Sequence, residues 1–259
     1  NRFNALIRFI KWQIFSKFYN YPVLLPFSDT SSYLCWKGLT GVTGNWYFGL
    51  MEMEEMSFAS HFLKLDDVFY DIGANVGAYS LLTSQHVGCR VFCFEPHPTT
   101  FQHLLRNINI QKKQGLITAF NFGLGSEKSI VNFTTNLDTV NHVSLNSNDL
   151  TITVEINILD NLNLPMPSLI KIDVEGFEYN VLQGAFSTLE NLNLKAIIIE
   201  LNGSGNQFGI NDKDIDIFLR SFNFEPYTYD PFKRQLIKLN TYLNHNTIYI
   251  RDIEYCQNR

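Results

Sequence analysis

The sequence lacks several features that would point to common classes of protein. Its four cysteines include no Cys-x-x-Cys pair and no spacing typical of a metal site, so we expect reduced thiols in a cytoplasmic protein. No uncharged apolar run reaches the roughly 18 residues that a membrane-spanning helix needs. The formal net charge of -5 gives no overall attraction to a phosphate backbone, which argues against nucleic acid as a partner.

The 259 residues suffice for one large α/β domain plus a short extension, which we expect at residues 51–259 and 1–50 respectively. Within residues 3–18, apolar side chains recur at helical spacing, and Lys11 and Lys17 flank them. This apolar stripe consists of Phe3, Leu6, Ile7, Ile10, Ile14 and Phe18. It favours a helix that packs on its own protein or on a second subunit; the alternative is a basic amphipathic helix on an anionic membrane surface. Residues 31–50 combine aromatic residues with glycine turns, which predicts a small hairpin.

From residue 67 onward, short apolar runs alternate with amphipathic stretches, as in a parallel sheet covered by helices. We expect seven strands, at residues 68–72, 90–95, 116–122, 169–174, 195–201, 224–230 and 246–252. The clearest helix, "PTTFQHLLRNINIQ", follows the second strand. Residues 129–157 interrupt the alternation with a polar loop and two short strands, which we interpret as an insertion over the active face.

The first expected strand of the sheet runs into the glycine-containing loop "DIGANVGAYS". Such a turn before a helix presents backbone N–H groups and the positive end of a helix dipole to a ligand. A dinucleotide loop would need three glycines, yet Asn75 and Ala78 stand at two of those positions. The pattern is instead D-x-G-x-N-x-G, and the carboxylate of Asp71 would repel a diphosphate. The loop therefore favours S-adenosylmethionine, a nucleoside with a cationic tail, over NAD.

Glu95 ends the second expected strand, 24 residues after Asp71. A carboxylate at this tip can accept hydrogen bonds from both hydroxyls of a ribose. Because NAD also contains ribose, Glu95 supports a nucleoside without choosing between the two cofactors.

The fourth expected strand, "LIKIDVEGFE", carries charges where a strand buried on both faces should be apolar. Burying Lys171, Asp173 and Glu175 is costly unless these groups are paired or used. One interpretation is a structural Lys171–Asp173 ion pair, with Glu175 opening the next helix. The other is that Asp173 faces the methionine part of the cofactor or the acceptor, while Lys171 and Glu175 tune its charge. Glu200 and Asn202, at the tip of the following strand, extend this polar rim.

Four stretches occur in a characteristic order: "FYDIGANVGAYS", "FEPHPTTFQHLLRNI", "LIKIDVEGFEYNVLQGA" and "IIIELN". Together they resemble the motifs of the FkbM-type methyltransferases, a branch of the class I S-adenosylmethionine-dependent enzymes. The resemblance implies a seven-stranded, mostly parallel Rossmann-like sheet with its last strand antiparallel and helices on both faces. It further implies methyl transfer to a hydroxyl of a sugar, a glycan or another small hydroxylated metabolite.

Carried over position by position, the resemblance also implies a set of cofactor residues. They are Asp71, Gly73, Asn75, Gly77, Glu95, Asn121, Gly123 and Leu124. The first four would form the cofactor loop, Glu95 would hold the ribose, and "NFGLG" would lie by the adenine. Asp173 would border the transfer site.

Methyl transfer from a sulfonium has an activated leaving group, so the protein must mainly position the acceptor and exclude water. A general base would assist a sugar hydroxyl; Asp173 and Glu175 are candidates by position, and His142 by its ordinary pKa. We assign His142, Glu200 and Asn202 to the acceptor side, and we expect His97 near the adenine edge or in solvent. Asp173, Glu200 and Asn202 could ligate magnesium, but our prediction is that no metal is bound.

Three alternatives fit the sequence less well than an O-methyltransferase. The missing loop glycines count against a nicotinamide-dependent oxidoreductase. The charges retained in the fourth strand count against a non-catalytic protein that merely keeps the cofactor fold. Base methylation of nucleic acid would call for prolines and an aromatic residue after the fourth strand, where this sequence has "DVEGFE".

Overall fold

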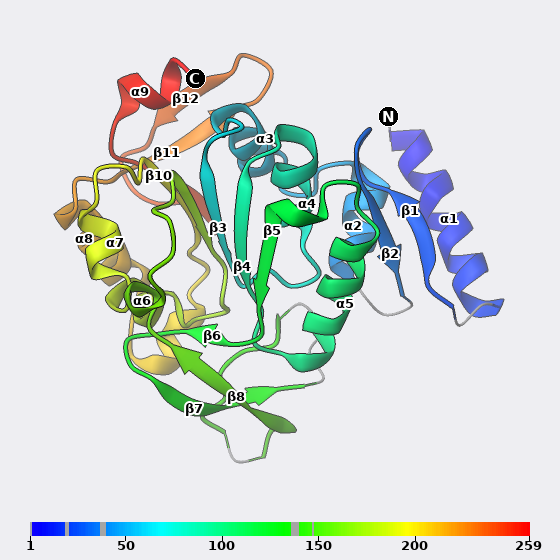
Figure 1. The fold of residues 1–259 in the computed structure, drawn as a ribbon, viewed down its shortest axis with the longest axis horizontal. Helices are drawn as coiled ribbons and strands as arrows, with labels where there is room; N and C mark the ends of the chain where they lie inside the picture. The colour runs from blue at the N-terminus through cyan, green and yellow to red at the C-terminus, as the bar shows by residue number, and fades with distance from the viewer. Residues whose placement is uncertain (1, 19–20, 37–39, 136–139, 147) are drawn as a thin grey trace.

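The computed structural model describes residues 2–18, 21–36, 40–135, 140–146 and 148–259. Its centre is an eight-stranded sheet in the order β12-β11-β13-β10-β9-β3-β4-β5 (Figure 1). The strands are β3 (Val68–Ile72), β4 (Arg90–Phe94), β5 (Ile117–Phe120), β9 (Leu169–Ile172), β10 (Ala196–Glu200), β11 (Glu225–Asp230), β12 (Gln235–Lys238) and β13 (Asn246–Ile250). The strands from β10 to β5 are mutually parallel, and β13 pairs antiparallel with both β10 and β11.

The expected α/β class and the antiparallel strand are therefore confirmed, and all seven expected strands lie in this sheet. The eighth strand, β12, is an addition that pairs antiparallel with β11. Asp230 stabilises the turn of this hairpin, because its side chain accepts hydrogen bonds from the N–H groups of Phe232 and Lys233.

Helices cover both faces of the sheet because successive strand residues point to opposite sides. Phe69 packs with α3 (Met53–Phe62), α4 (Ala78–Leu82) and α5 (Pro98–Asn109) in one buried cluster. Tyr70, the next residue, packs with α6 (Glu178–Gln183), α7 (Phe186–Glu190) and α8 (Asp212–Ser221) in a second cluster. Short helical turns complete the connections: η1 (Thr83–Val87), η2 (Gln114–Leu116), η4 (Leu159–Leu162) and η5 (Ser204–Phe208).

A second sheet of three strands lies below the central one in Figure 1, in the order β6-β8-β7. It comprises β6 (Gly123–Leu124), β7 (Ser129–Thr134) and β8 (Thr151–Asn157). The two strands expected within residues 129–157 are thus present, and they form an antiparallel pair.

The N-terminal part contains the expected helix, α1 (Arg2–Phe18), and a hairpin, but the hairpin lies earlier than expected. It is formed by β1 (Val23–Pro26) and β2 (Ser32–Cys35), and the serine hydroxyls of Ser28 and Ser31 bond within its turn. Residues 40–48 of the segment expected as a hairpin fold as a helix, α2 (Thr40–Phe48). Its glycines do not prevent a helix because α2 packs on α1, so tertiary contacts override local preference.

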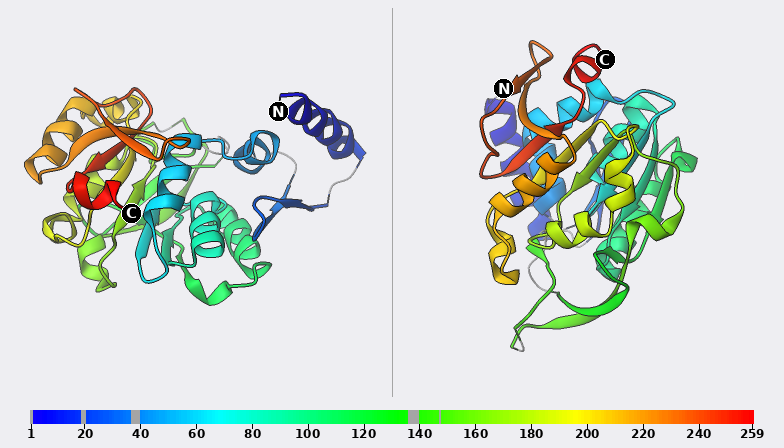
Figure 2. Two further views of the ribbon diagram at one scale, coloured as in Figure 1. Left: turned by 90° about the horizontal axis from the view of Figure 1, so that it is seen from above. Right: turned by 90° about the vertical axis from the view of Figure 1, so that its left-hand side faces the viewer.

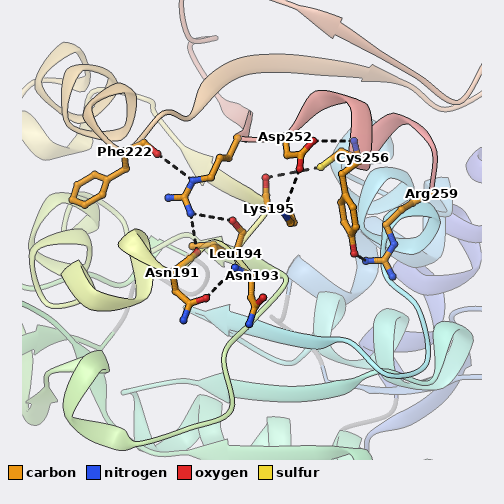
Figure 3. A network of polar contacts seen from close by, with 10 residues as sticks. Asn191, Asn193, Leu194, Lys195, Phe222, Asp252, Cys256 and Arg259 are labelled. Atoms are coloured by element: carbon orange, nitrogen blue, oxygen red, sulfur yellow. Dashed lines mark hydrogen bonds and ion pairs between the residues drawn. The ribbon is translucent and has the colours of Figure 1, made fainter.

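The C-terminal helix α9 (Ile253–Gln257) is tied to the amino ends of the central strands by a polar network (Figure 3). The guanidinium group of Arg251 donates to the carbonyl oxygens of Asn191 and Phe222, at 2.8 and 3.1 Å. Lys195 pairs with Asp252 at 3.3 Å. This network serves packing, and it lies at the edge of the sheet opposite to the carboxyl ends where ligands bind in such folds.

Candidate active site

A cavity of about 350 Å³ opens at the carboxyl ends of β3, β4, β9 and β10. Its walls come from the loops after these strands, from the start of α3, and from Phe133, Val140 and Asn141. Asn45 of α2 also lines it, so a residue of the expected extension contributes to the site. The cavity has the size and the position of a small-molecule site in an open α/β sheet.

The loop after β3 requires glycine at Gly73. Its φ is +80°, and a Cβ atom there would lie 1.7 Å from the carbonyl oxygen of Asp173. Gly77 has a φ of +96° and is the N-cap residue before α4, but it does not line the cavity. Only glycine lets this loop cross the tip of β9 so closely.

Three backbone N–H groups of this loop are turned inward, contrary to our expectation that the loop presents its N–H groups to a ligand. Gly73 and Ala74 both donate to the carbonyl oxygen of Phe94, and Asn75 donates to Glu95. The reason is that the end of β4 supplies acceptors directly beside the loop. These N–H groups are therefore not available to a diphosphate.

Asp71 lines the cavity but is 1% exposed and partly used for structure. One of its carboxylate oxygens accepts from the N–H and the hydroxyl of Ser80, at 3.0 and 2.6 Å. Burial raises the pKa of Asp71, and the charge of Lys171 opposes that rise. The carboxylate thus holds the first turn of α4 and adds negative potential to the cavity.

Glu95 lies at the tip of β4 with both carboxylate oxygens oriented by the backbone. Oε2 accepts from the N–H of Asn75 at 3.0 Å, and Oε1 accepts from the N–H of His97 at 2.8 Å. Burial raises the pKa of Glu95 to about 7, against the lowering effect of these two hydrogen bonds. Each oxygen retains a second lone pair, so the carboxylate can still accept two hydroxyl groups.

Lys171 and Asp173 form an ion pair of 2.6 Å at the end of β9. The ammonium group of Lys171 also lies 4.9 Å from the ring centroid of Tyr79, whose hydroxyl donates to Glu52 at 2.5 Å. Burial acts to lower the pKa of Lys171, but the carboxylates of Asp173, Glu52 and Asp71 raise it above its ordinary value. The Lys171–Asp173 ion pair of the first interpretation is therefore present, and it does not exclude the second, because Asp173 also lines the cavity.

Glu175 does not open the next helix, as one interpretation required. Its φ is +53°, and α6 begins at Glu178. Glu178 is buried, and its Oε1 accepts from the N–H groups of Val174 and Gly176 at 3.1 and 3.0 Å. Glu178 thereby shapes the loop that carries Asp173 and Glu175; sequence analysis missed this role, although the Gly176-x-Glu178 spacing was a signal for it.

Asp173, Glu175 and Glu200 converge, and each offers an oxygen within 4.8 Å of the others. Burial, and then the charge of Asp173, raise the pKa of Glu175 to about 7. Burial and the same charge raise the pKa of Glu200 to about 8. Glu175 and Glu200 can therefore accept or release a proton near neutral pH. Together with Asp173 they are called the acidic triad below. The same oxygens could ligate a divalent cation, and the absence of a metal stays a prediction.

Several expected site residues do not line the cavity. Asn202 is exposed and bonds within its own turn, while the ring of His142 bonds to the carbonyl oxygen of Val140. Gly123 and Leu124 form β6, because this segment is recruited into the second sheet through β8. Asn121 donates to the carbonyl oxygens of Glu95 and Pro96, so it supports the backbone beside the cavity.

His97 lines the cavity and is 8% exposed, so it is not in solvent. Its Nδ1 accepts from the N–H of Thr100 at the start of α5, which places the proton of the neutral ring on Nε2. Nε2 is buried and has no protein partner among the described residues. Burial lowers the pKa of His97, so the ring is a neutral donor for a ligand.

The chain was compared with known proteins. The model of the family described as "Methyltransferase FkbM domain" matches residues 71–226. Hexuronic acid methyltransferase AglP of Haloferax volcanii is 29% identical over 154 residues, which cover 58% of this chain and 60% of that protein. Methyltransferase 1 of Beauveria bassiana is 25% identical over 170 residues, which cover 55% of this chain and 68% of that protein.

Among solved structures, the FkbM methyltransferase of Methylobacillus flagellatus KT shares the fold. Its TM-score is 0.51 at 16% identity, and the match covers 80% of this chain and 54% of that one. The match to the family model extends over more than half of the sequence and contains the loop after β3, Glu95 and the acidic triad. The chain belongs to the FkbM methyltransferase family.

Proposed function

We propose that this protein is an S-adenosylmethionine-dependent O-methyltransferase that methylates a hydroxyl group of a sugar, a glycan or a similar small metabolite. The chemistry is assigned to residues 51–259, and residues 1–50 form an extension that contributes Asn45 to the cavity wall. The name of AglP, a hexuronic acid methyltransferase, supports a sugar acceptor.

The observation that carries the cofactor assignment is the charge of the cavity. Among the described residues that line it, six carry carboxyl groups and one carries an amine: Glu52, Asp71, Glu95, Asp173, Glu175, Glu200 and Lys171. S-adenosylmethionine bears a sulfonium, an ammonium and one carboxylate, and therefore one net positive charge. A diphosphate would meet repulsion, and the N–H groups of Gly73, Ala74 and Asn75 are already bonded within the protein. The lining thus suits S-adenosylmethionine and disfavours NAD.

Within this cavity, Glu95 would accept the ribose hydroxyls, and the buried N–H of His97 would donate to the nucleoside or to the acceptor. When bound, S-adenosylmethionine supplies a methyl group on a positively charged sulfur. Met51, Met56 and Phe133 line the same cavity and would limit the access of water.

We assign the general base to Glu175. Its pKa of about 7 is suited to accepting a hydroxyl proton at neutral pH. Glu200, with a pKa of about 8, holds its proton longer, so Glu175 is the member of this pair that ionises first as pH rises. Asp173 is already engaged by Lys171 and acts mainly on the charge of its neighbours.

Titration calorimetry tests the cofactor assignment directly. The full chain should bind S-adenosylmethionine and S-adenosylhomocysteine and should not bind NAD; the reverse pattern would refute the proposal. A second step supplies methyl-labelled S-adenosylmethionine with a panel of monosaccharides, nucleotide sugars and glycans. Label transferred to nitrogen or carbon, rather than to oxygen, would contradict the assigned reaction.

A further inference from the structure

Helix α1 contacts the rest of the protein through one face. Trp12 and Ser16 are each 8% exposed, and the ring of Trp12 lies 6.3 Å from that of Trp46 in α2. Arg8 adds a hydrogen bond of 2.8 Å to the carbonyl oxygen of Trp46. In the left view of Figure 2, α1 lies at the outer edge of the molecule, away from the central sheet.

The opposite face of α1 presents a row of uncovered apolar side chains. Leu6, Ile10, Ile14 and Phe18 are 55%, 47%, 58% and 78% exposed. Because they are spaced by four residues, they share one side of the helix, and Trp12 falls about 200° away from both Ile10 and Ile14. These four residues are the exposed part of the stripe recognised in the sequence; the side chain of Phe3 lies outside the described residues. The described residues therefore leave these four side chains largely uncovered.

The charge around this row is of one sign. The charged side chains within the first 28 residues are Arg2, Arg8, Lys11 and Lys17, and the first acidic residue is Asp29. With a net charge of -5 overall and +4 in this segment, the remaining residues carry -9. An anionic surface would therefore attract α1 and repel the body of the protein.

A second copy of the chain fits this surface less well. Two stripes packed together would bring the lysines of both helices to the same interface, and α1 offers no carboxylate to pair with them. An anionic lipid surface accepts both features, because the acyl region takes the apolar side chains and the phosphate headgroups take Lys11 and Lys17. No helix in the described part of the chain is long and apolar enough to cross a membrane.

We propose that α1 lies in the plane of an anionic membrane surface, with Leu6, Ile10, Ile14 and Phe18 inserted and Lys11 and Lys17 on the headgroups. Membrane binding by α1 does not depend on which molecule accepts the methyl group in the cavity. It would hold the protein at the lipid surface, which is a property beyond the proposed reaction.

Sedimentation of the purified full chain with vesicles tests the proposal. The protein should bind vesicles of phosphatidylcholine mixed with phosphatidylglycerol, bind pure phosphatidylcholine much less, and be released by salt. Ile14→Asp combined with Phe18→Asp should weaken binding at least tenfold. Lys11→Gln with Lys17→Gln should weaken it about 25-fold, at roughly fivefold per lysine.

The matched control replaces two exposed apolar residues elsewhere, Leu192→Asp with Ile217→Asp, which are 72% and 56% exposed in the wild type. It should bind vesicles as the wild type does. Circular dichroism checks that each variant is folded, and the lysine variant and the salt series remain informative if the aspartate variant is not. Equal binding by wild type and both α1 variants would overturn the proposal. So would an absence of vesicle binding together with a dimer, seen by light scattering, that Ile14→Asp with Phe18→Asp converts to monomers.

Discussion

Replacement of Glu95 by glutamine should weaken cofactor binding strongly while leaving the fold intact. Both carboxylate oxygens already accept backbone N–H groups, from Asn75 and from His97. In the glutamine variant one of these N–H groups would face an amide NH₂ instead of an acceptor. The two hydroxyl contacts to ribose would also lose their charged partner. Hydrogen bonds to charged groups contribute about 1.5–3 kcal/mol, so Kd should rise about 10- to 150-fold.

The assay is titration calorimetry with S-adenosylhomocysteine at pH 8, where Glu95 is ionised because its pKa is about 7. Glu127→Gln, at an exposed position, is the matched control and should leave Kd unchanged. The wild-type affinity should also fall as pH drops below 7, since protonation removes the same acceptor, and the variant should lose this dependence. A variant Kd within about twofold of the wild type would refute the role of Glu95 in ribose binding.

Four further outcomes follow from the site. In the folded protein, buried carboxyls with a pKa raised to about 7 or 8 keep protons that the unfolded chain releases near pH 4.5. The melting temperature of the ligand-free protein should therefore decrease as the pH is raised from 5 to 8, and an increase would contradict this. Gly73→Ala, with its Cβ against Asp173, should lower the free energy of unfolding in urea by roughly 3–5 kcal/mol. Gly49→Ala has a similar φ but meets no atom within 4 Å, and should cost only about 1 kcal/mol. Glu175→Gln should lower kcat about 100-fold or more and remove the rise of kcat with pH near 7, whereas an unchanged pH profile would exclude Glu175 as the base. Because Lys171 is already paired with Asp173, it is not free to bind the carboxylate of a hexuronate, which the acidic cavity would repel. A neutral hexoside should therefore be methylated about tenfold more efficiently than the matching hexuronate. A preference for the hexuronate would show that another cation faces the acceptor.

Much of the fold could be predicted because its signals are local. Each expected strand is a short apolar run bounded by polar or turn residues, and all seven occur near the expected positions. The hairpin was placed too late because the glycines of residues 40–48 resemble turn signals, whereas α1 stabilises this segment as a helix. Local preference is a weak guide where packing supplies most of the stability.

The candidate site was predicted less completely than the fold. The loop after β3, Glu95 and the charged end of β9 were recognised, since parallel strands bring their carboxyl ends to one edge. His142 and Asn202 were expected at the cavity, but each bonds within its own loop. The sequence of a loop has no periodic pattern of apolar and polar residues that would indicate which way each side chain faces.

The sequence by itself determined the strands, the departure from a dinucleotide loop, and the acidic residue at the tip of β4. These depend on residue type at fixed short spacings. Only the tertiary structure decided that Glu200 lines the cavity with Asp173 and Glu175 whereas Asn202 does not, that Glu52 reaches Tyr79, and that Leu6, Ile10, Ile14 and Phe18 of α1 are exposed. Such relations join residues far apart in the chain, or depend on which face of a helix meets its neighbour. They follow from strand order and packing, which no local pattern specifies.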